Sequence, residues 1–277
     1  GFEWEIDSDD VLGARCEQAG DVVLRDDIVR RGRHTVEVAV GGEAEGTERF
    51  ETRHSYRLPC ETAPVATPFP VLCDLDGVVW LAQRPIAGSR EAVARLRDAG
   101  HRVLFVTNNS MHRIGEQEAA LAAVGIPATG DVVTSAMSAA LLVEPHERVL
   151  VCGGPGVEEA LAARGVAYEV ADRDPSAPID VVMVGFHRWF DYEVMRRAAT
   201  AVRAGARLIA TNDDATYPTP DGPIPGGGAI LAGIVTAGGV APLTAGKPYP
   251  PVAGLLGRVL GSDDLSEAVM VGDRPDT

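Results

Sequence analysis

The hydrophobic pattern of the chain changes at residue 71. From there on, short apolar runs of strand length alternate with segments whose apolar residues recur at helical spacing. This alternation predicts an α/β fold with a doubly wound parallel sheet, covered by helices on both faces. The predicted strands are residues 71–73, 102–106, 149–152, 167–170, 180–184, 208–210 and 268–271, and the predicted helices are residues 89–99, 116–124, 135–143, 157–164, 191–204, 229–237 and 251–260.

The segment before residue 71 has a different pattern. Residues 36–40 alternate apolar and polar side chains, two glycines follow, and residues 49–58 alternate again. We therefore expect residues 1–58 to be a short β-rich segment. Residues 59–70 contain four prolines among threonine and alanine, which predicts a linker.

Composition and charge narrow the classes of partner. The 277 residues are 45% hydrophobic and 23% charged, which favours a folded core over disorder. The formal charge is −15, with 25 basic against 40 acidic residues, and this disfavours nucleic acid and anionic membranes as partners. No apolar run is long enough to span a bilayer. An anionic substrate would need cations gathered locally.

The cysteines bear on the compartment. Cys16, Cys60, Cys73 and Cys152 have no metal-ligand spacing and include no Cys-x-x-Cys pair. Residues 1–10 hold five acidic side chains and no basic one, so we expect no secretory signal peptide. We expect a cytoplasmic protein in which Cys73 and Cys152 are buried thiols.

The first candidate site lies in residues 71–77, Val-Leu-Cys-Asp-Leu-Asp-Gly. Side chains two apart on a strand point to the same side, so Asp74 and Asp76 should project together from the carboxyl end of a buried strand. Open α/β sheets bind their ligands at that end. Two carboxylates held so close require a cation or a shared proton.

Polar residues at other strand ends and loops complete a candidate phosphoryl-transfer site. Asp74 would act as the nucleophile, and Asp76 would transfer protons to the leaving alcohol and from the attacking water. Phosphate would be bound by Thr107 and Asn108, which follow the second strand, and by Lys247, which lies between Gly246 and Pro248. This set is what transfer through an aspartyl-phosphate requires.

The same edge of the sheet offers oxygen ligands for a metal. Asp273 follows the last predicted strand. Mg²⁺ prefers oxygen ligands, so we expect Asp74 and Asp273 to hold it by their side chains and Asp76 by its backbone carbonyl. The metal and Lys247 would together offset the repulsion between a phosphate and a carboxylate nucleophile.

Four stretches, in this order, resemble the motifs of the haloacid dehalogenase-like (HAD) phosphatases. Residues 74–80, Asp-Leu-Asp-Gly-Val-Val-Trp, resemble the first, and residues 107–110, Thr-Asn-Asn-Ser, the second. Residues 246–248, Gly-Lys-Pro, resemble the third, and residues 272–277, Gly-Asp-Arg-Pro-Asp-Thr, the fourth. Residues 210–230 are also similar to the NagD-like branch (subclass IIA), which includes p-nitrophenyl phosphate, phosphoglycolate and glycerol-3-phosphate phosphatases. The resemblance covers residues 71–277 and implies a Mg²⁺-dependent phosphatase of small phosphorylated metabolites.

The distance between the second and third motifs is too long for one crossover, so a further α/β unit must be inserted there. In the resembling branch this unit is a cap domain, which we place at residues 148–220, between HAD core parts at residues 71–147 and 221–277. A closing cap expels water and contacts substrate, and His187 and Arg188 are its candidate contacts. The cap is also a candidate surface for a homo-oligomer. Because the chain ends inside the fourth motif, we expect the second core part to be truncated.

Other functions are compatible with these residues. A catalytically impaired HAD-like scaffold that only binds partners is the main alternative outside enzymes. A haloacid dehalogenase is the first alternative among enzymes, but the resemblance implies that Asp76 is the group that a phosphatase adds. A phosphomutase would need a different cap.

Overall fold

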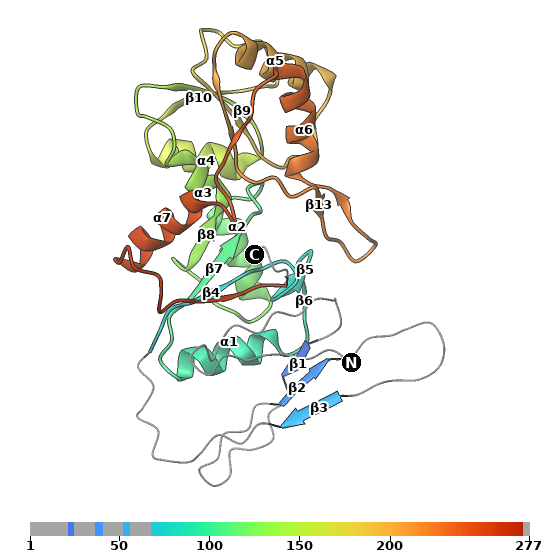
Figure 1. Ribbon diagram of the computed structural model, residues 1–277, viewed down its shortest axis with the longest axis vertical. Coiled ribbons are helices and arrows are strands. Elements are labelled where there is room, and N and C mark those ends of the chain that lie inside the picture. The colour runs from blue at the N-terminus through green and yellow to red at the C-terminus, as the bar shows by residue number, and fades with distance from the viewer. Residues whose placement is uncertain (1–21, 25–36, 41–51, 56–67, 274–277) are drawn as a thin grey trace. The chain divides into compact units, whose positions relative to one another are not determined.

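The structure is a computed structural model that describes residues 22–24, 37–40, 52–55 and 68–273 (Figure 1). Residues 69–272 form one compact unit, and the N-terminal segment belongs to another. In the N-terminal segment, β1 (Val22–Leu24), β2 (Glu37–Val40) and β3 (Thr52–Ser55) form an antiparallel sheet in that order, and a β-rich segment over residues 1–58 stays a prediction. Most of the predicted linker, together with Cys16 and Cys60, lies outside the described residues.

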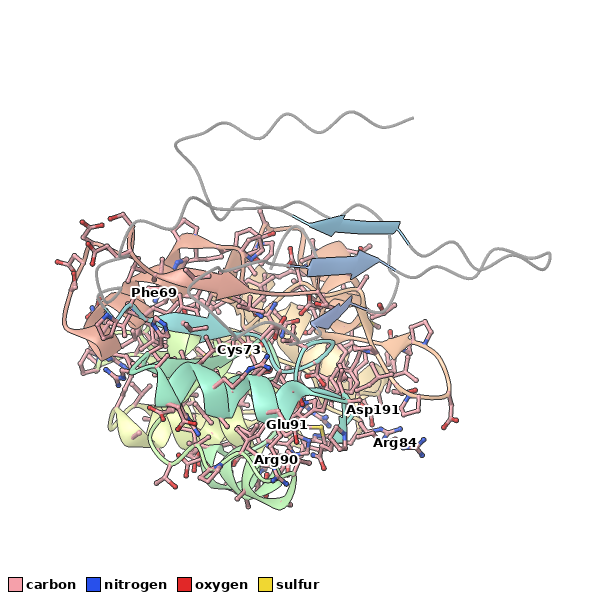
Figure 2. All side chains as sticks on the ribbon, turned by 90° about the horizontal axis from the view of Figure 1, so that it is seen from below. Phe69, Cys73, Arg84, Arg90, Glu91 and Asp191 are labelled. Carbon is pink, nitrogen blue, oxygen red and sulfur yellow. The ribbon has the colours of Figure 1, made fainter. Side chains whose placement is uncertain are left out.

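The first parallel sheet of the larger unit has the order β16-β4-β7-β8. Its strands are β4 (Val71–Cys73), β7 (Val103–Thr107), β8 (Val132–Thr134) and β16 (Val269–Val271). Alternate side chains face opposite ways, so Cys73 and Phe105 pack with α1 (Ser89–Asp98) and α2 (Ile114–Ala123). Leu72 and Leu104 pack with α7 (Pro250–Leu260) on the other face. Figure 2 shows Arg90 and Glu91 of α1, both exposed, and Cys73 on its strand.

The second parallel sheet has the order β10-β9-β11-β12-β15. Its strands are β9 (Arg148–Cys152), β10 (Ala167–Val170), β11 (Val181–Val184), β12 (Arg207–Ala210) and β15 (Leu243–Thr244). The helices α5 (Tyr192–Arg203) and α6 (Gly227–Gly238) cover one face, and α3 (Ser135–Ala140) and α4 (Pro155–Ala163) cover the other. The doubly wound α/β prediction is therefore confirmed for both sheets. The strand β15 and the covering helix α6 lie beyond residue 220, so this sheet and its helices extend past the predicted end of the cap. The domain boundaries stay a prediction.

The described part of the chain contains two short hairpins that the sequence pattern did not predict. One joins β5 (Trp80–Leu81) to β6 (Arg84–Pro85), and the other joins β13 (Thr216–Tyr217) to β14 (Ile224–Pro225). Strands of two residues are too short to show a period of two in the sequence. Both hairpins carry residues of the candidate site.

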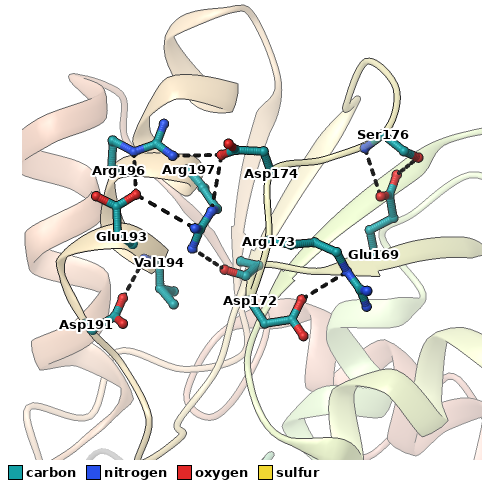
Figure 3. A network of polar contacts seen from close by, with 11 residues as sticks. Glu169, Asp172, Arg173, Asp174, Ser176, Asp191, Glu193, Val194, Arg196 and Arg197 are labelled. Atoms are coloured by element: carbon teal, nitrogen blue, oxygen red, sulfur yellow. Dashed lines mark hydrogen bonds and ion pairs between the residues drawn. The ribbon is translucent and has the colours of Figure 1, made fainter.

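Charged side chains cap helix α5 and tie it to the loop between β10 and β11 (Figure 3). Asp191 caps the helix by accepting a hydrogen bond from the Val194 backbone N–H at 2.8 Å. Asp174 pairs with Arg196 at 2.7 Å and with Arg197 at 3.2 Å. These pairs are exposed for the most part, so each adds little to stability.

Two further predictions about the chain can be compared with the structure. Cys73 and Cys152 are buried free thiols, as expected, and burial raises the pKa of each to about 12. None of the helices in the described ranges has the length and apolar character that crossing a bilayer demands.

Candidate active site

The two predicted catalytic carboxylates follow β4 directly. The backbone N–H of Asp74 donates to the Val271 carbonyl at 2.9 Å, so β16 holds the start of this loop. The loop then turns back at Gly77, whose φ of 92° lies in the left-handed region that favours glycine. The Gly77 N–H donates to the Trp80 carbonyl at 2.8 Å and closes the turn. Asp74 is 5% exposed and Asp76 is partly buried.

Lys247 lies against Asp74. Its Nζ is 2.7 Å from Asp74 Oδ2, and both side chains are only 7% exposed. Asp74 Oδ1 accepts a hydrogen bond from the Leu75 backbone N–H at 2.7 Å. Among the described residues, Lys247 Nζ has no hydrogen bond to an uncharged group. The positive charge of Lys247 is therefore balanced by the Asp74 carboxylate. The nucleophile predicted from the sequence and the predicted cation are therefore brought together.

Asn108 fixes the loop that carries Lys247. Its Oδ1 accepts the Lys247 backbone N–H at 2.8 Å, and its Nδ2 donates to the Lys247 carbonyl at 3.1 Å. Nδ2 also donates to Asp214 Oδ2 at 2.9 Å. Gly246 allows this close approach, because a Cβ there would lie 2.5 Å from Asn108 Oδ1. With its amide group so engaged, Asn108 could bind phosphate through its backbone N–H, and that role stays a prediction.

Thr107, the last residue of β7, is 2% exposed. Its Oγ1 accepts the Asn109 backbone N–H at 3.0 Å, which fixes the start of the following loop. The hydroxyl hydrogen remains as the donor that a phosphate oxygen could use. Phosphate binding by Thr107 stays a prediction.

Asp76 lies beside two aromatic side chains. The Tyr217 hydroxyl donates to Asp76 Oδ1 at 3.2 Å, and the Trp80 side chain lies close to the carboxylate. The pKa of Asp76 is raised to about 6, chiefly by burial and also by the nearby charge of Asp74, while Tyr217, Trp80 and Lys247 act in the opposite direction. A carboxyl with a raised pKa suits a group that must give and take protons.

The sequence motifs included Tyr217 and Trp80, but sequence reasoning gave neither a role. Tyr217 lies 141 residues from Asp76 along the chain. The only signal was that Trp80 stands in the stretch that carries Asp76 and that Tyr217 stands in a stretch similar to the NagD-like branch. Nothing in local periodicity shows which carboxylate a distant hydroxyl will reach.

The structure places His187 and Arg188 in the loop after β11 with opposite exposure. Arg188 is exposed, whereas His187 is 3% exposed and lies 5.0 Å from Trp189 and 5.9 Å from Phe190, measured between ring centroids. Neither ring nitrogen of His187 has a hydrogen-bond partner among the described residues. Burial lowers the pKa of His187 to about 4, although the charge of Asp191 acts to raise it. Substrate contact by either residue stays a prediction.

The third predicted metal ligand, Asp273, lies two residues after the end of β16. Within the described ranges, no group of three or more His, Cys, Asp and Glu side chains is arranged to hold a metal ion. The Mg²⁺ site therefore stays a prediction. The oxygen donors of Asp74 and Asp76 are nevertheless of the type that Mg²⁺ prefers, and the charge of Asp74 already raises the pKa of Asp76, as expected of two carboxylates that a cation would stabilise.

Comparison with known proteins agrees with this geometry. Residues 71–167 match the family model described as haloacid dehalogenase-like hydrolase. The chain is 39% identical to D-glycerol 3-phosphate phosphatase of Mycobacterium tuberculosis over 75% of its own length and 58% of that protein's. It is 35% identical to acid sugar phosphatase of Staphylococcus saprophyticus over 74% of this chain and 79% of that one.

A solved structure of a phosphatase is also similar to this chain. The glycerol phosphate phosphatase of M. tuberculosis in complex with magnesium superposes with a TM-score of 0.70 and 35% identity, over 78% of this chain and 65% of that chain. The arrangement of Asp74, Asp76 and Lys247 and these similarities lead to one conclusion. This chain belongs to the haloacid dehalogenase-like hydrolase family, in its NagD-like branch of phosphatases.

Proposed function

We propose that this chain hydrolyses phosphate monoesters of small metabolites through a phosphorylated Asp74. The observation that carries the proposal is the buried ion pair between Asp74 and Lys247, at 2.7 Å. A carboxylate attacks a phosphate only where positive charge offsets their repulsion, and Lys247 supplies such a charge at the attacking group. Asp74 is also oriented, because Leu75 and Lys247 each hold one of its oxygens.

The first chemical step forms a bond from an Asp74 oxygen to phosphorus and breaks the bond from phosphorus to the ester oxygen. Asp76 gives its proton to the departing alcohol. In the second step Asp76, now a carboxylate, takes a proton from water, whose oxygen attacks phosphorus. The bond between phosphorus and Asp74 breaks, and phosphate and the free carboxylate are released. Thr107, the Asn108 backbone N–H and Lys247 would bind the phosphoryl oxygens.

Mg²⁺ would be held by the side chains of Asp74 and Asp273 and by the backbone carbonyl of Asp76. When bound, it supplies positive charge beside the phosphate. Relatives support this choice, because the glycerol phosphate phosphatase of M. tuberculosis forms a complex with magnesium. These three groups, two carboxylates and one carbonyl, all offer oxygen atoms, which are the ligands that Mg²⁺ prefers.

The names of the relatives favour a phosphorylated polyol or sugar as substrate. His187 and Arg188 would contact its organic part. Phe186, next to His187 in the chain, stacks on Tyr217 with ring centroids 5.6 Å apart, and Tyr217 reaches Asp76, so this loop begins beside the catalytic carboxyl. Assembly of a homo-oligomer through the second sheet and its helices, and location in the cytoplasm, remain part of the proposal.

The test is the hydrolysis of 4-nitrophenyl phosphate with and without Mg²⁺ by the chain, by Asp74→Asn and by Asp98→Asn. Asp98 is exposed at the end of α1 and serves as the matched control. We expect Mg²⁺-dependent hydrolysis by the chain and the control, and none by Asp74→Asn. Absence of hydrolysis in all three would favour a binding scaffold, and halide release from a 2-haloacid without Mg²⁺ would favour a dehalogenase.

A further inference from the structure

Tyr217 reaches the active site from a hairpin that is remote in sequence. It ends β13, which pairs with β14, and the Gly226 backbone N–H donates to the Ala215 carbonyl at 2.9 Å to close the base of the hairpin. The hairpin leads directly into α6, which packs on the second sheet. The Tyr217 hydroxyl nevertheless donates to Asp76 Oδ1, in the loop after β4 of the first sheet, at 3.2 Å.

The position of the Tyr217 side chain is fixed from two further directions. Its hydroxyl also lies beside the Asn109 side chain, in the loop after β7. The Asn109 side chain is oriented in turn, because its Oδ1 accepts the Met111 backbone N–H at 3.0 Å. The Tyr217 ring stacks on Phe186 with planes 18° apart. The hydroxyl that donates to Asp76 is therefore flanked by Asn109, and the stacked ring has little freedom to turn away from Asp76.

Asp76 needs such support more than Asp74 does. Asp74 is held by a backbone N–H and by the ammonium of Lys247. The Asp76 side chain instead accepts a hydrogen bond from the Tyr217 hydroxyl and lies beside the Trp80 side chain. A general acid transfers its proton efficiently only when its carboxyl is held within hydrogen-bond reach of the leaving oxygen.

We propose that Tyr217 is a positioning residue that holds the Asp76 carboxyl for proton transfer to the leaving alcohol. The inference rests on the proposed phosphatase function and adds a residue to it. Tyr217 does not contact the phosphate in this role and acts only through Asp76. Since its hairpin continues into α6, Tyr217 also links the helices of the second sheet to the general acid.

The test compares two substrates of similar size, 4-nitrophenyl phosphate and benzyl phosphate. The 4-nitrophenolate ion leaves without a proton, whereas the far more basic benzyl alkoxide must be protonated as it leaves. We expect Tyr217→Phe to lower kcat/KM about tenfold for benzyl phosphate and less than about twofold for 4-nitrophenyl phosphate. kcat/KM is the correct quantity because it includes alcohol departure and excludes hydrolysis of the phosphorylated Asp74.

A matched control is available in Tyr168→Phe, because Tyr168 on β10 also lies beside a carboxylate, Glu158, away from the candidate catalytic residues. It should change kcat/KM for neither substrate. In an Asp76→Asn background, Tyr217→Phe should cause no further loss that depends on the leaving group. Thermal unfolding of each variant reports separately on any structural effect.

The outcomes separate the two proposals. If the unchanged chain hydrolyses both esters and Tyr217→Phe lowers both values of kcat/KM equally, or neither, the positioning role is overturned and the phosphatase stands. If the unchanged chain hydrolyses neither ester with Mg²⁺, the proposed function fails, and the role of Tyr217 fails with it.

Discussion

Replacing His187 with leucine should remove a large part of the pH dependence of folding stability. The imidazole is 3% exposed and has no hydrogen-bond partner for either nitrogen among the described residues. Burial lowers its pKa from 6.5 to about 4. The unfolded chain therefore binds a proton at mildly acidic pH that the folded chain does not bind.

The sign and size of the effect follow from these two pKa values. Because the folded pKa is the lower one, stability falls as the pH decreases through 6.5, and the loss levels off below about pH 4. Between about pH 7.5 and about pH 5 the loss amounts to about 2 kcal/mol. Asp76 has the opposite effect, since its pKa is raised to about 6 in the folded chain, so wild-type data alone would mix the two groups.

The assay is the melting temperature of the chain and of His187→Leu across this pH range. We expect the leucine variant to gain about 4–8 °C relative to the unchanged chain on going from about pH 7.5 to about pH 5. The contribution of Asp76 is common to both proteins and cancels in the difference. Val240→Leu, at an exposed position without a titratable side chain, is the control and should leave the pH dependence unchanged. Parallel curves for the chain and His187→Leu would refute the reasoning.

Three further predictions concern the candidate active site. Asp74→Asn leaves Lys247 as an unpaired buried charge and should destabilise the chain by about 3–5 kcal/mol, while adding Lys247→Met should recover most of that loss in thermal unfolding. Gly246→Ala would place a Cβ 2.5 Å from Asn108 Oδ1 and from the Thr211 carbonyl, so it should cost about 1–3 kcal/mol and lower activity; an unchanged melting temperature would contradict this. Removing Mg²⁺ with a chelator should abolish phosphate release, and adding Mg²⁺ back should restore it; activity that survives chelation would contradict the metal site.

The two candidate catalytic carboxylates could be located from the sequence because their signals are local. A buried strand that ends in Asp74 and Asp76 is visible as an apolar run followed by two carboxylates and a turning glycine. The parallel sheets were likewise predicted from strands and helices whose periods are visible over a few residues. The order of the motifs then implied that Thr107, Asn108 and Lys247 belong to the same site.

Only the tertiary structure decided how these residues are held. The Asn108 side chain hydrogen-bonds to the Lys247 loop, the Tyr217 hydroxyl reaches Asp76 across 141 residues, and His187 is buried without a hydrogen-bond partner among the described residues. The physical reason is that the surroundings of each side chain depend on where distant segments of the chain return, and the packing of the two sheets decides this. Composition and periodicity determined which elements form and which chemical groups they carry, and the fold determined which groups meet.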